Sequence, residues 1–318
     1  MKGKTNKYGV PEPTYMKDKN KLQKAITKAY KQMLDYLVLE LSFNPDNPHA
    51  IREQEIMRQV NYWLKEMNEQ LGEELERLIK KTFQEGAAYH RLSVKEVGSW
   101  SEAMSASTFN ALAVSKVSAL FRDTYSDILL ATNNTAESVK TLVRDTVSKV
   151  ARYHSLTNEK YSTQANELAK ELSKKGMSEK VKREGFVGIT DSAGRKWDLK
   201  TYSNMVIKTK VNQAFMQGVI HDSETTGLDL AVISNHGAED ACSKWEGMVI
   251  SMTGKTKGYI TYKQAKATNE IFHPNCEHKV HPIRGLDMLH EDDVALHMEK
   301  ARKIGDVDSR AYKKKRKK

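Results

Sequence analysis

Apolar residues recur at three- and four-residue steps through most of the first 180 positions of the chain. Between residues 14 and 41 they include Leu22, Ile26, Met33 and Leu37, and this spacing predicts an amphipathic helix. The same periodicity predicts further helices over residues 50–83, 101–131, 136–152 and 157–175. The first 180 residues should therefore form a helical domain with no chemistry of its own.

Residues typical of helix ends divide these segments. Thr135 and Thr157 stand where N-caps are expected, and Gly176 suits the position just after a helix. The prolines of "NPDNP" (44–48) should end the first helix, because proline disfavours helical geometry in the residue before it and donates no backbone hydrogen bond.

The pattern changes after Gly185. The stretch "FVGITDSAGRKWDL" (186–199) alternates apolar and polar residues, which predicts a β-hairpin with Asp191 opening its turn and Gly194 at positive φ. Beyond it the sequence predicts a helix over 202–226, a buried strand within 228–237, short strands within 243–262 and a helix over 289–303. The predicted fold class is α+β and predominantly α. A long-helix N-terminal domain is followed by a small α+β C-terminal domain with a short hairpin and Cys/His loops.

The sequence predicts four successive segments along the chain. They are a basic arm over 1–13, a helical domain over 14–180, a small α+β domain over 181–288, and a helix with a basic tail over 289–318.

The net charge of +11 lies at the two ends of the chain. Residues 1–40 carry nine lysines against four acidic residues, and residues 300–318 carry ten basic residues against two. Basic ends on a nearly neutral body indicate a polyanion partner, above all nucleic acid, although a merely solubilising tail would have the same composition. The densest run is "KKKRKK", and it comprises Lys313, Lys314, Lys315, Arg316, Lys317 and Lys318. No base-specific feature accompanies it.

The remaining bulk features are those of a soluble protein made in the cytoplasm. The mean hydropathy is −0.66, and no apolar run approaches the roughly 20 residues that a membrane helix needs. The first residues contain no apolar core of a secretory signal. Two cysteines cannot form a disulfide framework, and in a cytosol we expect them to be reduced.

The usual catalytic motifs are missing from the sequence: it contains no G-x-S-x-G elbow, no phosphate-binding loop and no H-E-x-x-H pair. "TGKTKG" (253–258) imitates a phosphate-binding loop in composition but lacks the upstream glycine and the following helix. Cys276 between His273 and His278 would formally allow thiol catalysis, but histidines so close on a short loop more often serve as ligands or caps.

Ligand-type side chains gather in two stretches, "SNHGAEDACSKW" and "HPNCEH". A structural zinc site needs four thiolate or imidazole groups, and the candidates are Cys242, His273, Cys276, His278 and His236. Two alternatives stay open. "HPNC" suits a metal-free turn with Pro274 fixing φ and Cys276 packed as a small apolar residue, and Cys242 could pair with Cys276 in a disulfide.

Three blocks together span about residues 186–285: "ITDSAGRKWDLKTYSNMVIKT", "VISNHGAEDACSKWEGMVIS" and "HPNCEHKVHPIRG". In this order and spacing they resemble the phage minor capsid protein 2 family, and more distantly the phage head-morphogenesis (Mu F-like) proteins. The family's pattern falls on Gly194, Arg195, Trp197, Tyr202, Met205, Lys208, Thr209, His236, Trp245, Gly247, Asn275, Cys276 and His278. Where the family usually has arginine this chain has Lys208, which offers a point charge in place of a bidentate fork.

The resemblance implies a virion protein and not an enzyme. Its place would be the capsid interior near the portal, with host cytoplasm as the site of assembly. Its partners would be the portal protein or the major capsid protein, together with packaged double-stranded DNA contacted without sequence preference. It would aid head assembly, or DNA packaging and ejection, and the helical domain would dock on the portal or capsid. The alternative is a metal-dependent nuclease or toxin-like enzyme carried in the head, with Glu239 and Asp240 beside His236 as the only carboxylate candidates.

Overall fold

The computed structural model describes residues 5–43, 51–107, 109–158 and 162–305, and it is predominantly helical with two small antiparallel sheets. This confirms the predicted fold class. The chain forms two compact units, each built from separate segments. The first comprises 1–19, 76–122 and 208–318, and the second 20–75 and 123–207. Helices α2 (Glu53–Ser93), α4 (Ala111–Asn158) and α7 (Leu199–Thr226) each contribute to both. The linear boundaries at 13, 180 and 288 stay a prediction.

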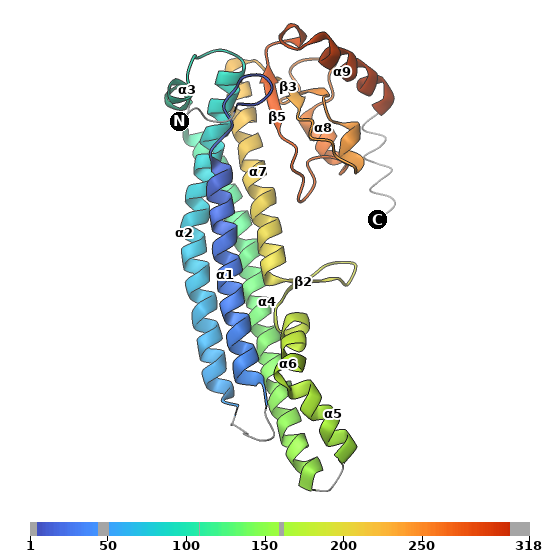
Figure 1. Ribbon diagram of the computed structural model, residues 1–318. Helices are drawn as coiled ribbons and strands as arrows, with labels where there is room; N and C mark the ends of the chain where they lie inside the picture. The colour runs from blue at the N-terminus through green and yellow to red at the C-terminus, as the bar shows by residue number, and fades with distance from the viewer. Residues whose placement is uncertain (1–4, 44–50, 108, 159–161, 306–318) are drawn as a thin grey trace. The chain divides into compact units, whose positions relative to one another are not determined.

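The second unit is built around packed helices. Helix α1 (Tyr15–Leu41) runs beside parts of α2 and α4 (Figure 1), and one continuous apolar cluster joins them. The cluster includes Met33, Leu37, Val60, Leu64 and Val143, which lie at the three- and four-residue spacing seen in the sequence. Helices α5 (Ser162–Leu172) and α6 (Lys174–Lys180) and a short π-helix over Val181–Gly185 complete the unit's helical part.

The predicted hairpin is confirmed in the second unit. Strand β1 (Val187–Thr190) pairs antiparallel with β2 (Lys196–Asp198). The Asp191 carboxylate accepts backbone hydrogen bonds from Ala193 and Arg195, and Gly194 has a φ of 76°. Asp191 thus opens the turn and Gly194 supplies its left-handed residue.

Several predicted helix boundaries are wrong. Thr135 does not begin a helix, because α4 runs through it and its buried hydroxyl donates to the carbonyl of Ala131. Thr157 likewise lies inside α4. Gly176 belongs to the first turn of α6, where its N–H donates to the N-cap Ser173. In all three places the structure continues or begins a helix where a cap-type residue was expected to divide it.

In the first unit α2 continues to Ser93, ten residues beyond its predicted end. Here Gly86 faces the backbone of Phe215 on α7, and Gly218 of α7 faces the backbone of Phe83. A side chain at Gly86 would bring its Cβ to 2.2 Å from the Phe215 carbonyl oxygen. Gly86 therefore permits the close packing of α2 against α7.

A three-stranded antiparallel sheet belongs to the first unit, with its strands in the order β4-β3-β5. Strands β3 and β5 are labelled in Figure 1. The central strand β3 (Leu230–Ile233) is fully buried, as the sequence predicts. It pairs with β4 (Val249–Ser251) and β5 (Val280–Ile283). Helices α3 (Trp100–Ala106), α8 (Tyr262–Ala267) and α9 (Glu291–Ile304) and short 3₁₀ turns over Ala241–Lys244 and Leu286–Met288 complete the unit.

The loop after β4 folds around a carboxylate. Buried Asp229 accepts hydrogen bonds from Ser251 Oγ at 2.5 Å, from Thr253 Oγ1 at 2.7 Å and from the hydroxyl of Thr256. The backbone N–H of Lys255 also points at it, at 3.2 Å. The sequence that imitates a phosphate-binding loop therefore cradles an anion from its own chain.

Asp229 should make the stability of the first unit depend on acid pH. Burial opposes ionisation of its carboxyl group, but the hydrogen bonds from Ser251, Thr256 and Thr253 outweigh it and lower the pKa to about 2, from an ordinary value of 3.8. Because the folded-state pKa is the lower one, the stabilisation is present above about pH 4 and disappears as the pH falls through about 2.

We therefore expect Asp229→Asn to lower the free energy of unfolding by about 1–2 kcal/mol more near pH 6 than near pH 2. Urea unfolding followed by circular dichroism measures this difference. The exposed Asp287→Asn is the matched control and should show no such dependence. An Asp229→Asn penalty equal at both pH values would contradict the assignment.

Candidate metal centre

Two loops of the first unit bring the ligand-type side chains together. Cys242 lies in the 3₁₀ turn between β3 and β4, where Asp240 is the N-cap and accepts from the Cys242 N–H at 2.9 Å. His273 and Cys276 lie in the loop between α8 and β5. The Cys276 N–H donates to the His273 carbonyl at 3.0 Å, and Asn275 has a φ of 67°. Proline followed by a left-handed asparagine is the arrangement of a type II turn.

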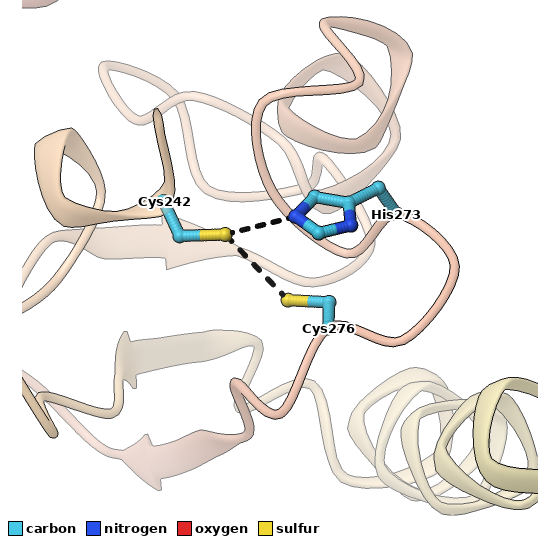
Figure 2. Close-up of side chains that lie close together, drawn as sticks. All are labelled: Cys242, His273 and Cys276. Atoms are coloured by element: carbon cyan, nitrogen blue, oxygen red, sulfur yellow. Dashed lines mark hydrogen bonds between the residues drawn. The ribbon is translucent and has the colours of Figure 1, made fainter. Parts of the chain in front are cut away.

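This turn places His273 and Cys276 against Cys242 (Figure 2). The Cys242 Sγ lies 3.1 Å from the His273 Nε2 and 3.9 Å from the Cys276 Sγ. Both cysteines are buried and free, so no Cys242–Cys276 disulfide is present in the structure. The turn that sequence analysis offered as an alternative to a metal site is the feature that assembles the group.

His278 extends the group toward a carboxylate. Its Nδ1 lies 3.4 Å from the Cys276 Sγ, and its Nε2 lies 3.1 Å from the Glu246 Oε1. Glu246 also accepts the backbone N–H groups of His236 and Ala238, at 2.9 and 3.1 Å. Both His278 and Glu246 are buried. Since a carboxylate only accepts, the His278 Nε2 carries the proton and its Nδ1 lone pair faces Cys276.

The fifth candidate, His236, groups with Glu246 and His278 and not with Cys242, His273 and Cys276. Its ring is 4.1 Å from that of His278, and its side chain is 42% exposed. Sequence reasoning missed Glu246, which follows His236 by ten residues. Only the folding of the loop back on itself brings them together, so sequence spacing carried no signal for it.

The electrostatics of the group disfavour thiol catalysis. Burial raises the pKa of the Cys242 thiol, and the neighbouring Cys276 raises it further. For His278, burial lowers the pKa, and the neighbouring Glu246 acts to raise it. A nucleophilic cysteine needs a depressed pKa from a nearby cation or helix N-terminus, and the pKa of Cys242 is shifted in the opposite direction.

The other family-motif residues of the first unit surround these loops. Thr209 of α7 accepts the Asn275 N–H at 3.1 Å, and Lys208 pairs with Glu277 at 2.7 Å. Trp245 is fully buried, and Gly247 has a φ of 78°. Lys208 is thus half-buried against one carboxylate and needs only a point charge there.

The family-motif residues of the second unit lie in its hairpin and at the start of α7. The Asp191 carboxylate binds Arg195 Nε at 2.7 Å and Trp197 Nε1 at 3.1 Å. Tyr202 and Met205 are both partly buried. Their contribution is therefore to the hairpin and the packing of this unit.

The basic run Lys313–Lys318 lies outside the described residues. Within the described ranges, no helix combines the length and apolar character needed to cross a membrane.

A family model described as Phage minor capsid protein 2 matches residues 49–318. Since the match spans well over half of the chain, the chain belongs to the phage minor capsid protein 2 family. Comparison with curated proteins and with solved structures gave no match. The chain is therefore a minor capsid protein of a phage virion and assembles with other virion components.

Proposed function

We propose that this minor capsid protein lies inside the phage head next to the portal and contacts packaged double-stranded DNA there. Through these contacts it aids head assembly, or DNA packaging and ejection. A protein in that place faces a dense array of phosphates, and sequence-independent lysine and arginine contacts suit such a surface. The concentration of positive charge at the two ends of the chain supports the proposal.

The observation that carries the proposal is a lysine face on α1. Lys21, Lys24, Lys28 and Lys31 follow one another at three- and four-residue steps, so they lie on one side of the helix. All four are exposed, and none forms a salt bridge within the described residues. The buried residues of α1, such as Leu22, lie on the opposite side. A row of unpaired lysines over about 15 Å of helix fits a run of backbone phosphates.

Neutralising this lysine face should weaken DNA binding in a salt-dependent way. For Lys21, Lys24, Lys28 and Lys31 changed together to glutamine, the slope of log binding constant against log salt should fall by about 3 to 4. Deleting residues 313–318 should lower the slope by about 5 more, at roughly 0.9 per lost phosphate contact. Fluorescence anisotropy with a random-sequence duplex at several salt concentrations measures both changes.

The matched control replaces Lys65 and Lys140, two exposed lysines of the same unit that pair with Glu69 and Glu137. Their change to glutamine should leave the slope within about 1 of the wild-type value. Equal slopes for the wild type and the α1 variant would contradict a DNA contact by this face. Degradation of supercoiled plasmid in the presence of magnesium would favour the nuclease alternative instead.

The location has its own test. Protein inside the head should resist added protease in intact virions and become sensitive once the heads are opened. Cross-links to the portal protein in purified heads test the proposed neighbour. Cleavage in intact virions would place the protein on the outside.

A further inference from the structure

We propose that Cys242, His273, Cys276 and His278 bind one structural zinc ion, and that Glu246 orients His278 for this role. The proposal does not depend on the position of the protein in the head. It goes beyond the set of candidates that the sequence offers, because it selects four ligands, leaves His236 out and adds a positioning carboxylate.

Three of the six donor-to-donor separations lie close to the edges of a zinc tetrahedron. Zinc–sulfur bonds of about 2.3 Å and zinc–nitrogen bonds of about 2.0 Å set tetrahedral ligand atoms about 3.3–3.8 Å apart. The observed separations are 3.9 Å between the Cys242 and Cys276 sulfurs, 3.1 Å from Cys242 to His273 and 3.4 Å from Cys276 to His278. A disulfide would need the sulfurs at about 2.05 Å.

Both imidazoles present a lone pair to the sulfurs. The Nδ1 of His273 lies 2.8 Å from the Pro274 carbonyl oxygen, which only accepts, so Nδ1 carries the proton and Nε2 is free to ligate. For His278 the roles are reversed, because Nε2 donates to Glu246 and Nδ1 faces Cys276. In each case an oxygen atom fixes the tautomer that a metal ligand needs.

Glu246 is well placed as the positioning residue. Its carboxylate is buried and held by the backbone N–H groups of His236 and Ala238, so it presents a fixed acceptor to His278. A carboxylate, a histidine and zinc in a row is the usual way in which proteins hold an imidazole ligand.

The two neighbours left out have other partners. Asp240 caps the turn that carries Cys242, and its other oxygen lies 3.9 Å from His273. His236 is exposed and faces Glu246 and His278. Zinc binding would release the two thiol protons to solvent, and it would join the loop after β3 to the loop before β5.

The test uses the purified full-length protein. We expect one zinc per chain by inductively coupled plasma mass spectrometry, retained through dialysis against a weak chelator. Replacement by cobalt(II) should give the intense d–d bands of a tetrahedral site and sulfur-to-cobalt charge transfer from two thiolates. These measurements on the wild type need no variant to fold. A protein that takes up neither metal, or whose two cysteines are found oxidised to a disulfide in the virion, would overturn the proposal.

Variants then identify the ligands. Cys242→Ser and Cys276→Ser should each remove about half of the charge transfer, and His278→Ala should weaken zinc binding measured by chelator competition. Glu246→Gln keeps an acceptor for the backbone groups but removes the charge, and it should weaken zinc binding about 10- to 100-fold with both thiolate bands retained.

Asp240→Asn and His236→Ala are the matched controls and should leave the zinc affinity within about threefold of the wild type. Asparagine keeps the cap on the Cys242 turn. Loss of zinc in Asp240→Asn together with full retention in His278→Ala would show that the fourth ligand is Asp240, and it would overturn the assignment of His278 and Glu246.

Discussion

Replacing Asp222 with alanine is expected to lower the free energy of unfolding of the first unit by about 3–5 kcal/mol, because it breaks a largely buried ion pair with Arg91 and leaves the buried His90 Nδ1 without its acceptor. Asp222 lies on α7 and is almost fully buried. One of its oxygens is 2.9 Å from the His90 Nδ1 and the other is 2.9 Å from the Arg91 Nε. The His90 Nε2 lies 2.6 Å from the Leu228 carbonyl oxygen. Both nitrogens of His90 therefore face acceptor oxygens.

Chemical denaturation followed by circular dichroism measures the loss. Glu224→Ala is the matched control, because Glu224 is on the same helix and pairs with Lys116 in a largely exposed position. Exposed pairs of this kind contribute about 0–1 kcal/mol. Asp222→Asn should fall between the two, since an amide can still bond His90 without the charge. A loss below about 1 kcal/mol in Asp222→Ala would show that the bonds from His90 and Arg91 to Asp222 contribute no more than an exposed ion pair does.

The network illustrates what the sequence could predict and what it could not. Three- and four-residue spacing locates the long helices, since each buries one face; α1 ends at Leu41, before the prolines, as predicted. The same spacing cannot show that His90 and Asp222, 132 residues apart, meet in the folded chain. Partners at such a separation are decided by packing between helices, which leaves no local pattern.

The errors at helix ends have a related cause. Threonine and glycine favour caps and turns because their local alternatives compete with the helix. Thr135 resolves that competition by bonding the carbonyl of Ala131 while buried against neighbouring residues, and Gly86 and Gly218 are required for close packing. A cap-type residue thus has two structural uses, and only the tertiary contacts tell them apart.

The residues of the candidate site could likewise be predicted only in part from the sequence. Cysteine and histidine content and the "HPNC" turn indicate which side chains could gather, and the structure brings Cys242, His273 and Cys276 together. Glu246 carries no ligand-type motif and enters only through the folding of the loop after β3. The "TGKTKG" stretch imitates a phosphate-binding loop only in composition, and the anion that it surrounds in the structure is the Asp229 carboxylate.

Replacing Gly218 with alanine is expected to destabilise the first unit by about 1–3 kcal/mol, even though alanine is the better helix former. A Cβ at this position would lie 2.0 Å from the carbonyl oxygen of Phe83 and 2.9 Å from the backbone nitrogen of Ala87. These atoms belong to α2 and cannot turn aside as a side chain can. The two helices must therefore move apart, and buried side chains such as Phe215 lose packing contacts.

If the two helices move apart in this way, a Cβ at Gly86 no longer clashes with the backbone of Phe215. Gly86→Ala and Gly218→Ala combined should therefore lower the free energy of unfolding by less than the sum of the single changes. Gly72→Ala is the matched control. It lies within α2, but its nearest neighbour is the ring edge of Tyr125 at 3.2 Å, a side chain that needs to shift by only a few tenths of an ångström. That change should be neutral or stabilise by up to about 1 kcal/mol. Denaturation midpoints of the four variants decide the matter, because additive losses for the double change would show that the two glycines act at independent contacts.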